Sequence, residues 1–208
     1  MATTISGSSG VTFPAGGVGN PAGAVVGTTD TQTLTNKTLG SGLVAGASYL
    51  TSGTSQATTS GTNIDFTGIP SWVKRITVMF NGVSTNGTSV PQVQIGSGSV
   101  SASGYAVTGT TTTNAGVVAG NSFTSGFALE ASTGSTGATT TIYGQLVLCL
   151  LGSNTWTGSG QFAHTGTSTS ATTAGASPAL SGALDRIRIT TVGGTDTFDA
   201  GSINILYE

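Results

Sequence analysis

Hydrophobic and polar residues alternate in short segments along most of the chain after residue 60. In residues 73–82, VKRITVMFNG, the side chains of Ile76, Val78 and Phe80 fall on one face of an extended chain, and those between them fall on the other. A period of two residues is typical of a strand with one buried face. The segment is therefore predicted to be a strand.

The same period recurs in two later segments. Residues 140–151, TTIYGQLVLCLL, place five residues on one face: Ile142, Gly144, Leu146, Leu148 and Leu150. In residues 185–192, Ile187 and Ile189 oppose two arginines and a threonine. Further strand candidates are 63–70, 91–96, 104–109, 123–130, 154–165, 178–184 and 203–208.

Turn residues separate these candidates, and no window of a dozen residues has the 3.6-residue period of a helix. Asn81-Gly82 and Asn86-Gly87 are dipeptides that supply the positive φ angles of tight hairpins, so both are predicted hairpin turns. Many short strands joined by Gly/Ser/Thr connections indicate a β-sandwich or jelly roll.

Residues 1–60 differ from the rest, because they hold little that could build a core. Pro14 and Pro21 disfavour regular structure in a Gly- and Ala-rich region. The tract 51–62, TSGTSQATTSGT, has the composition of a flexible linker. We therefore predict an all-β, jelly-roll-like β-sandwich domain over 61–208. An extended, mostly irregular N-terminal arm and linker over 1–60 precedes it.

Charge is scarce in this chain. Only 6% of its 208 residues are Asp, Glu, Lys or Arg, against roughly 25% in ordinary globular proteins. The formal net charge is −2, and 34 residues are Gly. A monomer with so little charge has weak protection against association. The composition therefore favours a surface that copies of the chain, or a larger assembly, cover.

The composition also argues against several classes of protein. Five basic residues cannot form the basic stripe that binds a phosphate backbone, so no nucleic-acid partner is expected. The longest apolar run, 146–151, is far short of the roughly 20 residues that span a bilayer. The N-terminus lacks the features of a Sec-type signal. We expect a soluble protein made in the cytoplasm, without membrane insertion.

His164 and Cys149 are the first candidates for catalytic chemistry. A Ser–His–Asp site would use His164, the single histidine, but the chain has no GxSxG elbow. A lone histidine on a strand is more often structural. Cys149 lies in LVLCLL and is predicted to be a small core hydrophobe. Gly17 and Gly19 begin a GxG that no strand–helix unit follows, so no dinucleotide cofactor is expected.

The carboxylates offer two further alternatives. Asp196 and Asp199 could supply oxygen ligands to Ca²⁺, although two aspartates in GTDTFDAGS also make an ordinary turn, which we favour. Glu130 with one of the aspartates could form a glycosidase pair, but the sequence places no two of them at the required spacing. We therefore predict no catalytic residue, no metal site and no cofactor.

Aromatic residues are the candidates for contacts with a sugar or a protein: Trp72, Tyr105, Tyr143, Trp156 and Phe162. Trp72 follows Pro70 at the start of a strand, where a sandwich usually buries a large ring. Trp156 lies after a predicted turn and is the better candidate receptor contact. The core remains the leading alternative for these rings.

One segment of the N-terminal region is strongly patterned. Residues 28–39, TTDTQTLTNKTL, closely resemble a segment near the N-terminus of many tailed-bacteriophage virion proteins, including tail-fibre and head-appendage proteins. Residues 64–89, IDFTGIPSWVKRITVMFNGVSTNGTS, and 198–208, FDAGSINILYE, look like a β-domain common at the C-termini of phage structural proteins. Nothing in 109–180 adds to the resemblance.

The resemblance implies a non-enzymatic virion component, made in the host bacterial cytoplasm. Such a component is held by its N-terminal segment and projects its β-domain towards a host-surface glycan or protein. By analogy with phage fibres and decoration proteins it would be a homotrimer, with capsid or tail proteins as partners. A short tail or head fibre is the favoured type. A capsid decoration protein that cements the head, and a polysaccharide-degrading spike, are the alternatives.

The residues of the patterned segment give this a physical basis. Alternating threonines favour an extended backbone, and such a segment can add a strand to the exposed edge of a partner's sheet. An ordinary strand or loop of the protein's own domain is the alternative. The predicted attachment residues are Thr31, Gln32, Thr33, Leu34, Thr35, Asn36, Lys37 and Leu39.

Overall fold

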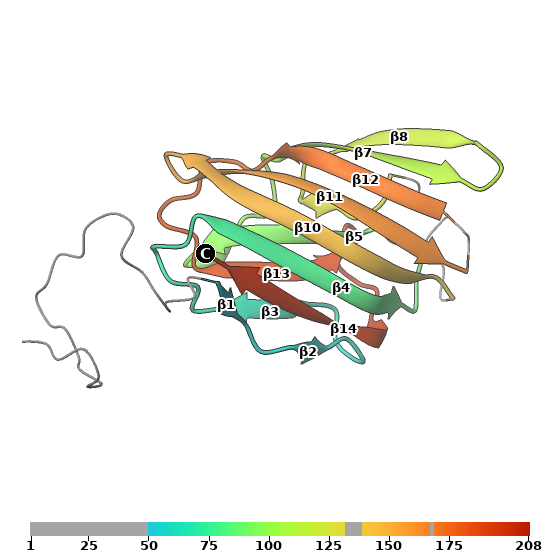
Figure 1. Cartoon of the computed structure of the whole chain (residues 1–208), viewed down its shortest axis with the longest axis horizontal. Coiled ribbons are helices and arrows are strands. Elements are labelled where there is room, and N and C mark those ends of the chain that lie inside the picture. The colour runs from blue at the N-terminus through green and yellow to red at the C-terminus, as the bar shows by residue number, and fades with distance from the viewer. Residues whose placement is uncertain (1–49, 132–138, 167–168) are drawn as a thin grey trace, which may run out of the picture. The chain divides into compact units, whose positions relative to one another are not determined.

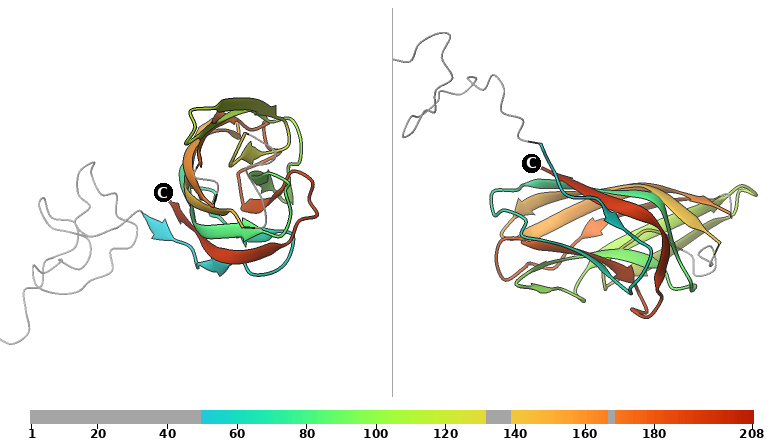
Figure 2. Two further views of the ribbon diagram at one scale, coloured as in Figure 1. Left: turned by 90° about the vertical axis from the view of Figure 1, so that its right-hand side faces the viewer. Right: turned by 90° about the horizontal axis from the view of Figure 1, so that it is seen from below.

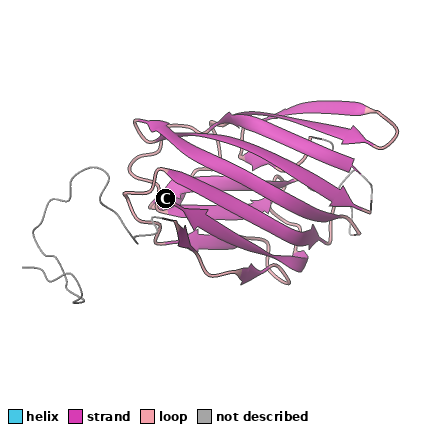
Figure 3. Ribbon diagram, in the orientation of Figure 1, coloured by secondary structure: helices cyan, strands magenta, loops and turns pink. Residues whose placement is uncertain are grey.

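Strands account for all the regular structure that the computed structural model describes, and Figure 3 shows no helix among these residues. The described residues are 50–131, 139–166 and 169–208. The predicted attachment segment lies outside them. Ser48–Glu208 forms one compact unit. No helix in the described part of the chain is long and apolar enough to cross a membrane.

The larger of two antiparallel sheets has nine strands (Figure 1). Its order is β1-β14-β4-β10-β11-β12-β7-β8, with β2 also paired to β14. The bounds are β1 Thr51–Ser52, β2 Gln56–Ala57, β4 Arg75–Thr85, β7 Ala106–Thr113, β8 Val118–Phe123, β10 Thr141–Gly152, β11 Thr155–Thr165, β12 Thr169–Ala176 and β14 Phe198–Tyr207.

The smaller sheet has five strands in the order β3-β13-β5-β6, with β9 also paired to β5. Its bounds are β3 Ile64–Thr67, β5 Pro91–Ser97, β6 Ser99–Val100, β9 Phe127–Ala128 and β13 Arg186–Thr191. In the end-on view of Figure 2 the two sheets lie on either side of one interior. The predicted all-β sandwich is confirmed.

The core forms where the inward faces of the two sheets meet. Ile76, Val78 and Phe80 of β4 are buried, as the alternation predicts. Ile187 and Ile189 of β13 lie opposite Ile95 and Val93 of β5, and all four have zero exposure. Burial of apolar surface stabilises by about 25 cal/mol per Å², so these alternating side chains hold the two sheets together.

Asn81-Gly82 is not a hairpin turn, and that prediction is wrong. The dipeptide lies inside β4, where Gly82 has φ +66° and the register of β4 against both β10 and β14 shifts by one residue. It is therefore a β-bulge. Asn86-Gly87 does not join paired strands either, because β4 and β5 belong to different sheets. Here the loop crosses the sandwich from one sheet to the other.

The tract 51–62 is not a flexible linker, and the domain begins about ten residues before the predicted boundary at residue 61. β1 and β2 both pair with β14. Thr58 is fully buried, and its hydroxyl donates to the carbonyl of Ala200 at 2.6 Å. Ala57 is the one apolar residue of this tract, so no hydrophobic pattern reveals these strands, which are ordered by pairing with β14.

Three further differences concern the strand list. The predicted strand 178–184 is a loop, whereas β8 and β12 were not predicted. β12 buries Thr169, Ala171 and Thr173 and exposes the residues between them. Burial alternates along β12 but hydrophobicity does not, so a hydrophobic pattern cannot identify this strand.

Candidate functional site

Five adjacent strands of the large sheet, β10, β11, β12, β7 and β8, contain no Asp, Glu, Lys or Arg. We call the outward-facing side of these strands the neutral face. Its four long strands present alternating side chains of small or uncharged residues: Tyr143, Gln145, Val147, Ser159, Gln161, Ala163, Ser170, Thr172, Ala174, Thr108, Thr110 and Thr112. The charged residues that the structure describes all lie elsewhere in the fold.

Amides and hydroxyls form a row across the neutral face. Gln145 lies opposite Gln161, Gln161 opposite Thr172, and Thr172 opposite Thr110. The two threonine hydroxyls are 2.7 Å apart. Directly opposed side chains in a sheet are close enough to interact, so the row is a continuous strip of donors and acceptors.

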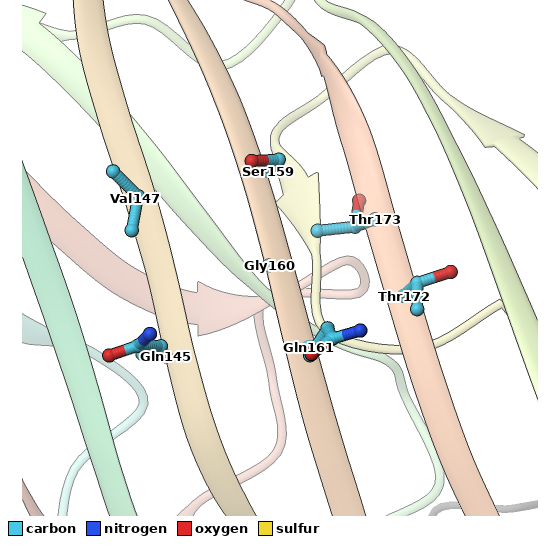
Figure 4. A pocket seen from close by; sticks show the side chains of 7 residues that line it. All are labelled: Gln145, Val147, Ser159, Gly160, Gln161, Thr172 and Thr173. Carbon is cyan, nitrogen blue, oxygen red and sulfur yellow. The ribbon is translucent and has the colours of Figure 1, made fainter.

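Two shallow hollows lie along this row. The first, of about 420 Å³, is lined by Gln145, Val147, Ser159, Gly160, Gln161, Thr172 and Thr173 (Figure 4). The second, of about 480 Å³, shares Gln161 and Thr172 with the first and adds two aromatic residues, Tyr143 and Phe162, and several small ones. The hollows form because short side chains lie between the longer Gln and Tyr side chains.

β8 forms one border of the neutral face. It pairs with β7 and with no other strand in the described residues. Of its six residues only Phe123 is buried. Val117 and Val118, at the turn from β7, are 61% and 66% exposed. Within the described residues this edge strand is therefore largely exposed and has a strand partner on one side only.

His164 lies in the core beneath the neutral face. Its Nδ1 is 3.2 Å from the Thr169 hydroxyl and 3.8 Å from the Glu130 carboxylate. Both titratable side chains have zero exposure. Burial lowers the pKa of His164 below its usual value, against the opposing effect of a backbone hydrogen bond to Leu129.

This cluster does not have the geometry of a catalytic triad. A triad needs the hydroxyl on one imidazole nitrogen and the carboxylate on the other, whereas here both lie beside Nδ1. The imidazole ring is not accessible from solvent, because the side chain of His164 is fully buried. The cluster is therefore placed to hold β11, β12 and the segment after β9 together.

Asp196 and Asp199 bond to protein groups in the loop after β4 and at the end of β4, respectively. The Asp196 carboxylate accepts from the backbone N–H of Ser89 at 2.8 Å, and the Ser84 hydroxyl donates to Asp199. The ideal Cβ of an alanine at Gly87 would lie 2.2 Å from Asp196 Oδ2. The described residues contain no group of three or more His, Cys, Asp or Glu side chains placed to hold a metal ion.

Three arginines in the described residues pair within the chain. Arg188 makes two hydrogen bonds to Asp65, at 2.8 and 2.6 Å. Arg186 bonds to Asp185, and its guanidinium holds the pKa of that carboxyl below its usual value. Arg75 pairs with Glu208 at 2.8 Å. The Asp65–Arg188 and Asp185–Arg186 pairs lie at the smaller sheet, whereas the Arg75–Glu208 pair borders the neutral face, because Arg75 lies opposite Cys149 of β10.

Trp156 is not a surface contact, so the prediction of a receptor contact there is wrong. The ring is 2% exposed, because Trp156 shares the inward side of β11 with Phe162 and His164. Trp72, which was expected to be buried, is instead exposed. It is 51% exposed, with its ring centroid 5.9 Å from that of Tyr207. Tyr143 is the exposed aromatic residue of the neutral face.

Tyr105 and Phe162 are core residues, as the alternative allowed. The Tyr105 hydroxyl donates to the Ser101 carbonyl at 3.0 Å and accepts from the Ile95 N–H at 2.9 Å, and burial raises its pKa to about 12. Cys149, predicted in the core, is exposed. It follows inward-facing Leu148, so the pleat of β10 turns it outward.

Of the sequence-predicted site residues, the described part of the chain contains Trp156 alone. Thr31 to Leu39 lie outside the described residues, and Trp156 belongs to the core. Sequence reasoning missed the neutral face, whose one signal in the sequence is the absence of charge from Ala106–Phe123 and from Thr139–Ala176. The chain matches no protein-family model, no curated protein and no solved structure.

Proposed function

We propose that this chain is a non-enzymatic structural protein of a tailed-bacteriophage virion. Its N-terminal segment, with Thr31 to Leu39, binds a capsid or tail protein. The β-domain projects from the particle as a homotrimer and binds the host surface, as in a short tail or head fibre. The resemblance of residues 28–39 to phage attachment segments motivates the proposal, and the trimer rests on the same analogy.

The placement of the ends of the domain supports it best. Thr51 of β1 lies opposite Tyr207 of β14, so the first and last strands of the domain meet at one end of the sandwich. The backbone N–H groups of Lys74 and Arg75 both donate to the Glu208 carbonyl, which fixes the C-terminus there. Thr51, the first residue of the first strand, therefore lies at this end of the domain.

If the protein is anchored at this end, the opposite end of the sandwich would be presented to the host surface. Along the shared register, β7 reaches Thr113 opposite Thr169, at the end remote from Tyr207. The turn with Val117 and Val118 lies beyond it, and Figure 1 shows this turn and the C-terminus on opposite sides of the domain. Host binding would use this remote end.

Deletion of residues 1–45 tests the anchoring step. The domain beginning at Ser48 is retained, so the truncated protein is expected to fold and to be missing from purified virions. A control keeps the length and composition of 28–39 but shuffles its order. The shuffled protein is also expected to be lost from the particle. Incorporation of the deleted protein at normal copy number would exclude this segment as the anchor.

A capsid decoration protein is the second candidate, because the neutral face is a surface that an assembly could cover. Phages that lack the domain separate the two: normal adsorption with fragile heads indicates a cement, and lost adsorption indicates a fibre. A polysaccharide-degrading spike is the third. Release of oligosaccharide from host capsule or lipopolysaccharide by the purified protein would overturn the non-enzymatic proposal.

A further inference from the structure

We infer that the neutral face, together with the open edge of β8, is the surface through which copies of this chain contact one another. This inference rests on the proposed function for the trimer, and it specifies which surface makes the contact. The partner is a second copy of the chain.

The distribution of charge is the first argument. Charged residues are depleted at the centres of protein interfaces, because a buried charge without a partner is costly. The five strands from β10 to β8 carry none. Arg188, Arg186 and Arg75 already pair with Asp65, Asp185 and Glu208. The neutral face therefore offers no ion pair to a charged partner, whereas the neutral face of a second copy brings no charge to bury.

The open edge of β8 is the second argument. Natural proteins block an exposed edge strand with a lysine, a proline, a bulge or a covering segment. Residues 106–123, which form β7, β8 and their turn, contain no charged residue and no proline. The β7–β8 register runs without a shift from Val107–Phe123 to Thr112–Val118. No lysine, proline or bulge is present there, and no described segment pairs with the outer side of β8, so the edge is a template for another strand.

These two features also distinguish a second copy from a saccharide. Amides and hydroxyls around Gln161 and Thr172 would suit a neutral sugar as well. The backbone groups along an edge, however, have the regular spacing of the donors and acceptors of another strand. Tyr143 is the one large aromatic ring that the face exposes, which leaves little surface for stacking a sugar ring. The edge and the face together therefore fit a protein sheet.

A charge placed on the face tests the inference. Thr172→Lys puts a cation at the centre of the neutral face, and Thr67→Lys is the matched control, an exposed strand threonine on the smaller sheet. The full chain is studied by light scattering coupled to size exclusion over a dilution series. Wild type and Thr67→Lys are expected to form the same oligomer. The oligomer of Thr172→Lys is expected to dissociate at a protein concentration more than tenfold higher than that of wild type, because a lysine buried at an interface without a partner is costly.

Hydrogen exchange of the β8 amides provides the second measurement. In wild type, amides along the outer edge of β8 are expected to be protected at high concentration and to lose that protection on dilution. In Thr172→Lys they are expected to exchange rapidly throughout. Unchanged thermal unfolding of dilute Thr172→Lys would show that the domain itself is intact, since both substitutions are at exposed positions.

Three outcomes would overturn the inference. The wild-type chain could remain monomeric up to millimolar concentration, or Thr172→Lys could dissociate no more easily than Thr67→Lys. Alternatively, neutral oligosaccharides could bind a monomer at Gln161 and Thr172, which would assign the face to a sugar. None of these outcomes affects the anchoring test, because virion incorporation after deletion of residues 1–45 is scored separately.

Discussion

The two tryptophans differ greatly in exposure, so substitutions at the two positions are expected to have very different effects on stability. Comparing them is a sensitive test of the fold. Trp156 is 2% exposed and Trp72 is 51% exposed. Replacing a buried aromatic residue by alanine typically costs about 3–5 kcal/mol through lost burial and the cavity that remains. For a domain of this size, about 2–4 °C per kcal/mol predicts that Trp156→Ala lowers the melting temperature by roughly 6–20 °C.

Trp72→Ala removes a half-exposed ring that pairs with Tyr207. An aromatic pair is worth about 0.5–1.5 kcal/mol beyond burial, so a shift of only a few degrees is expected. Trp156→Phe should cost less than Trp156→Ala. Phenylalanine keeps most of the ring, and it removes an indole N–H that has no hydrogen-bond partner among the described residues.

Intrinsic fluorescence separates the two sites directly, because these are the two tryptophans of the chain. In Trp72→Phe the remaining Trp156 should emit at short wavelength and resist an aqueous quencher. In Trp156→Phe the remaining Trp72 should emit at longer wavelength and be quenched readily. The reasoning would be refuted if Trp156 were quenched as readily as Trp72 in the folded protein, or if Trp156→Ala left the melting temperature unchanged.

Three further expectations follow from single positions. Burial lowers the pKa of His164 from its ordinary 6.5, so below that pH the unfolded chain takes up a proton that the folded chain does not. The free energy of unfolding, measured by urea titration, should therefore fall as the pH drops below 6.5. The fall should be steeper than in His164→Gln. Gly201→Ala should destabilise the domain by about 2–4 kcal/mol in thermal unfolding, because φ is +95° and the new Cβ would lie 2.4 Å from the Gly82 carbonyl oxygen. In the control Gly98→Ala, φ is +69° and no atom lies within 4 Å of the Cβ, so the cost should be only about 1–2 kcal/mol. Cys149 should react with an aqueous thiol reagent in the folded protein as fast as in urea, and slow labelling that appears only on unfolding would contradict its exposure.

Hydrophobic alternation predicted the strands whose inward residues are large. Residues 73–82 and 185–192 became β4 and β13 with the expected side chains buried. β12 was missed because its inward residues are Thr169, Ala171 and Thr173, which do not differ in hydrophobicity from their exposed neighbours. In such a strand the pairing with β11 and β7, and not local preference, decides the structure.

For two residues the alternation itself holds the right answer. The apolar neighbours of Cys149 favour a core position, but the alternation that places Leu146 and Leu148 inward places Cys149 outward. The turn before Trp156 favours exposure, but Trp156 shares its face of the strand with Phe162. The neutral face is different, because no local pattern shows that β7 lies beside β12. That neighbourhood is a property of the topology alone.

The pairing of the first strand with the last has a mechanical consequence. Leu50 continues directly into β1, which lies along the end of β14, and Gly53 and Thr58 donate backbone hydrogen bonds further along the same strand, to Ile205 and Gly201. A pull on Leu50 away from the domain runs parallel to these strands, so the hydrogen bonds are loaded in shear and share the force instead of opening one after another. β14 in turn is bonded along its length to β4. Tension would therefore spread into the centre of the large sheet before any strand is released.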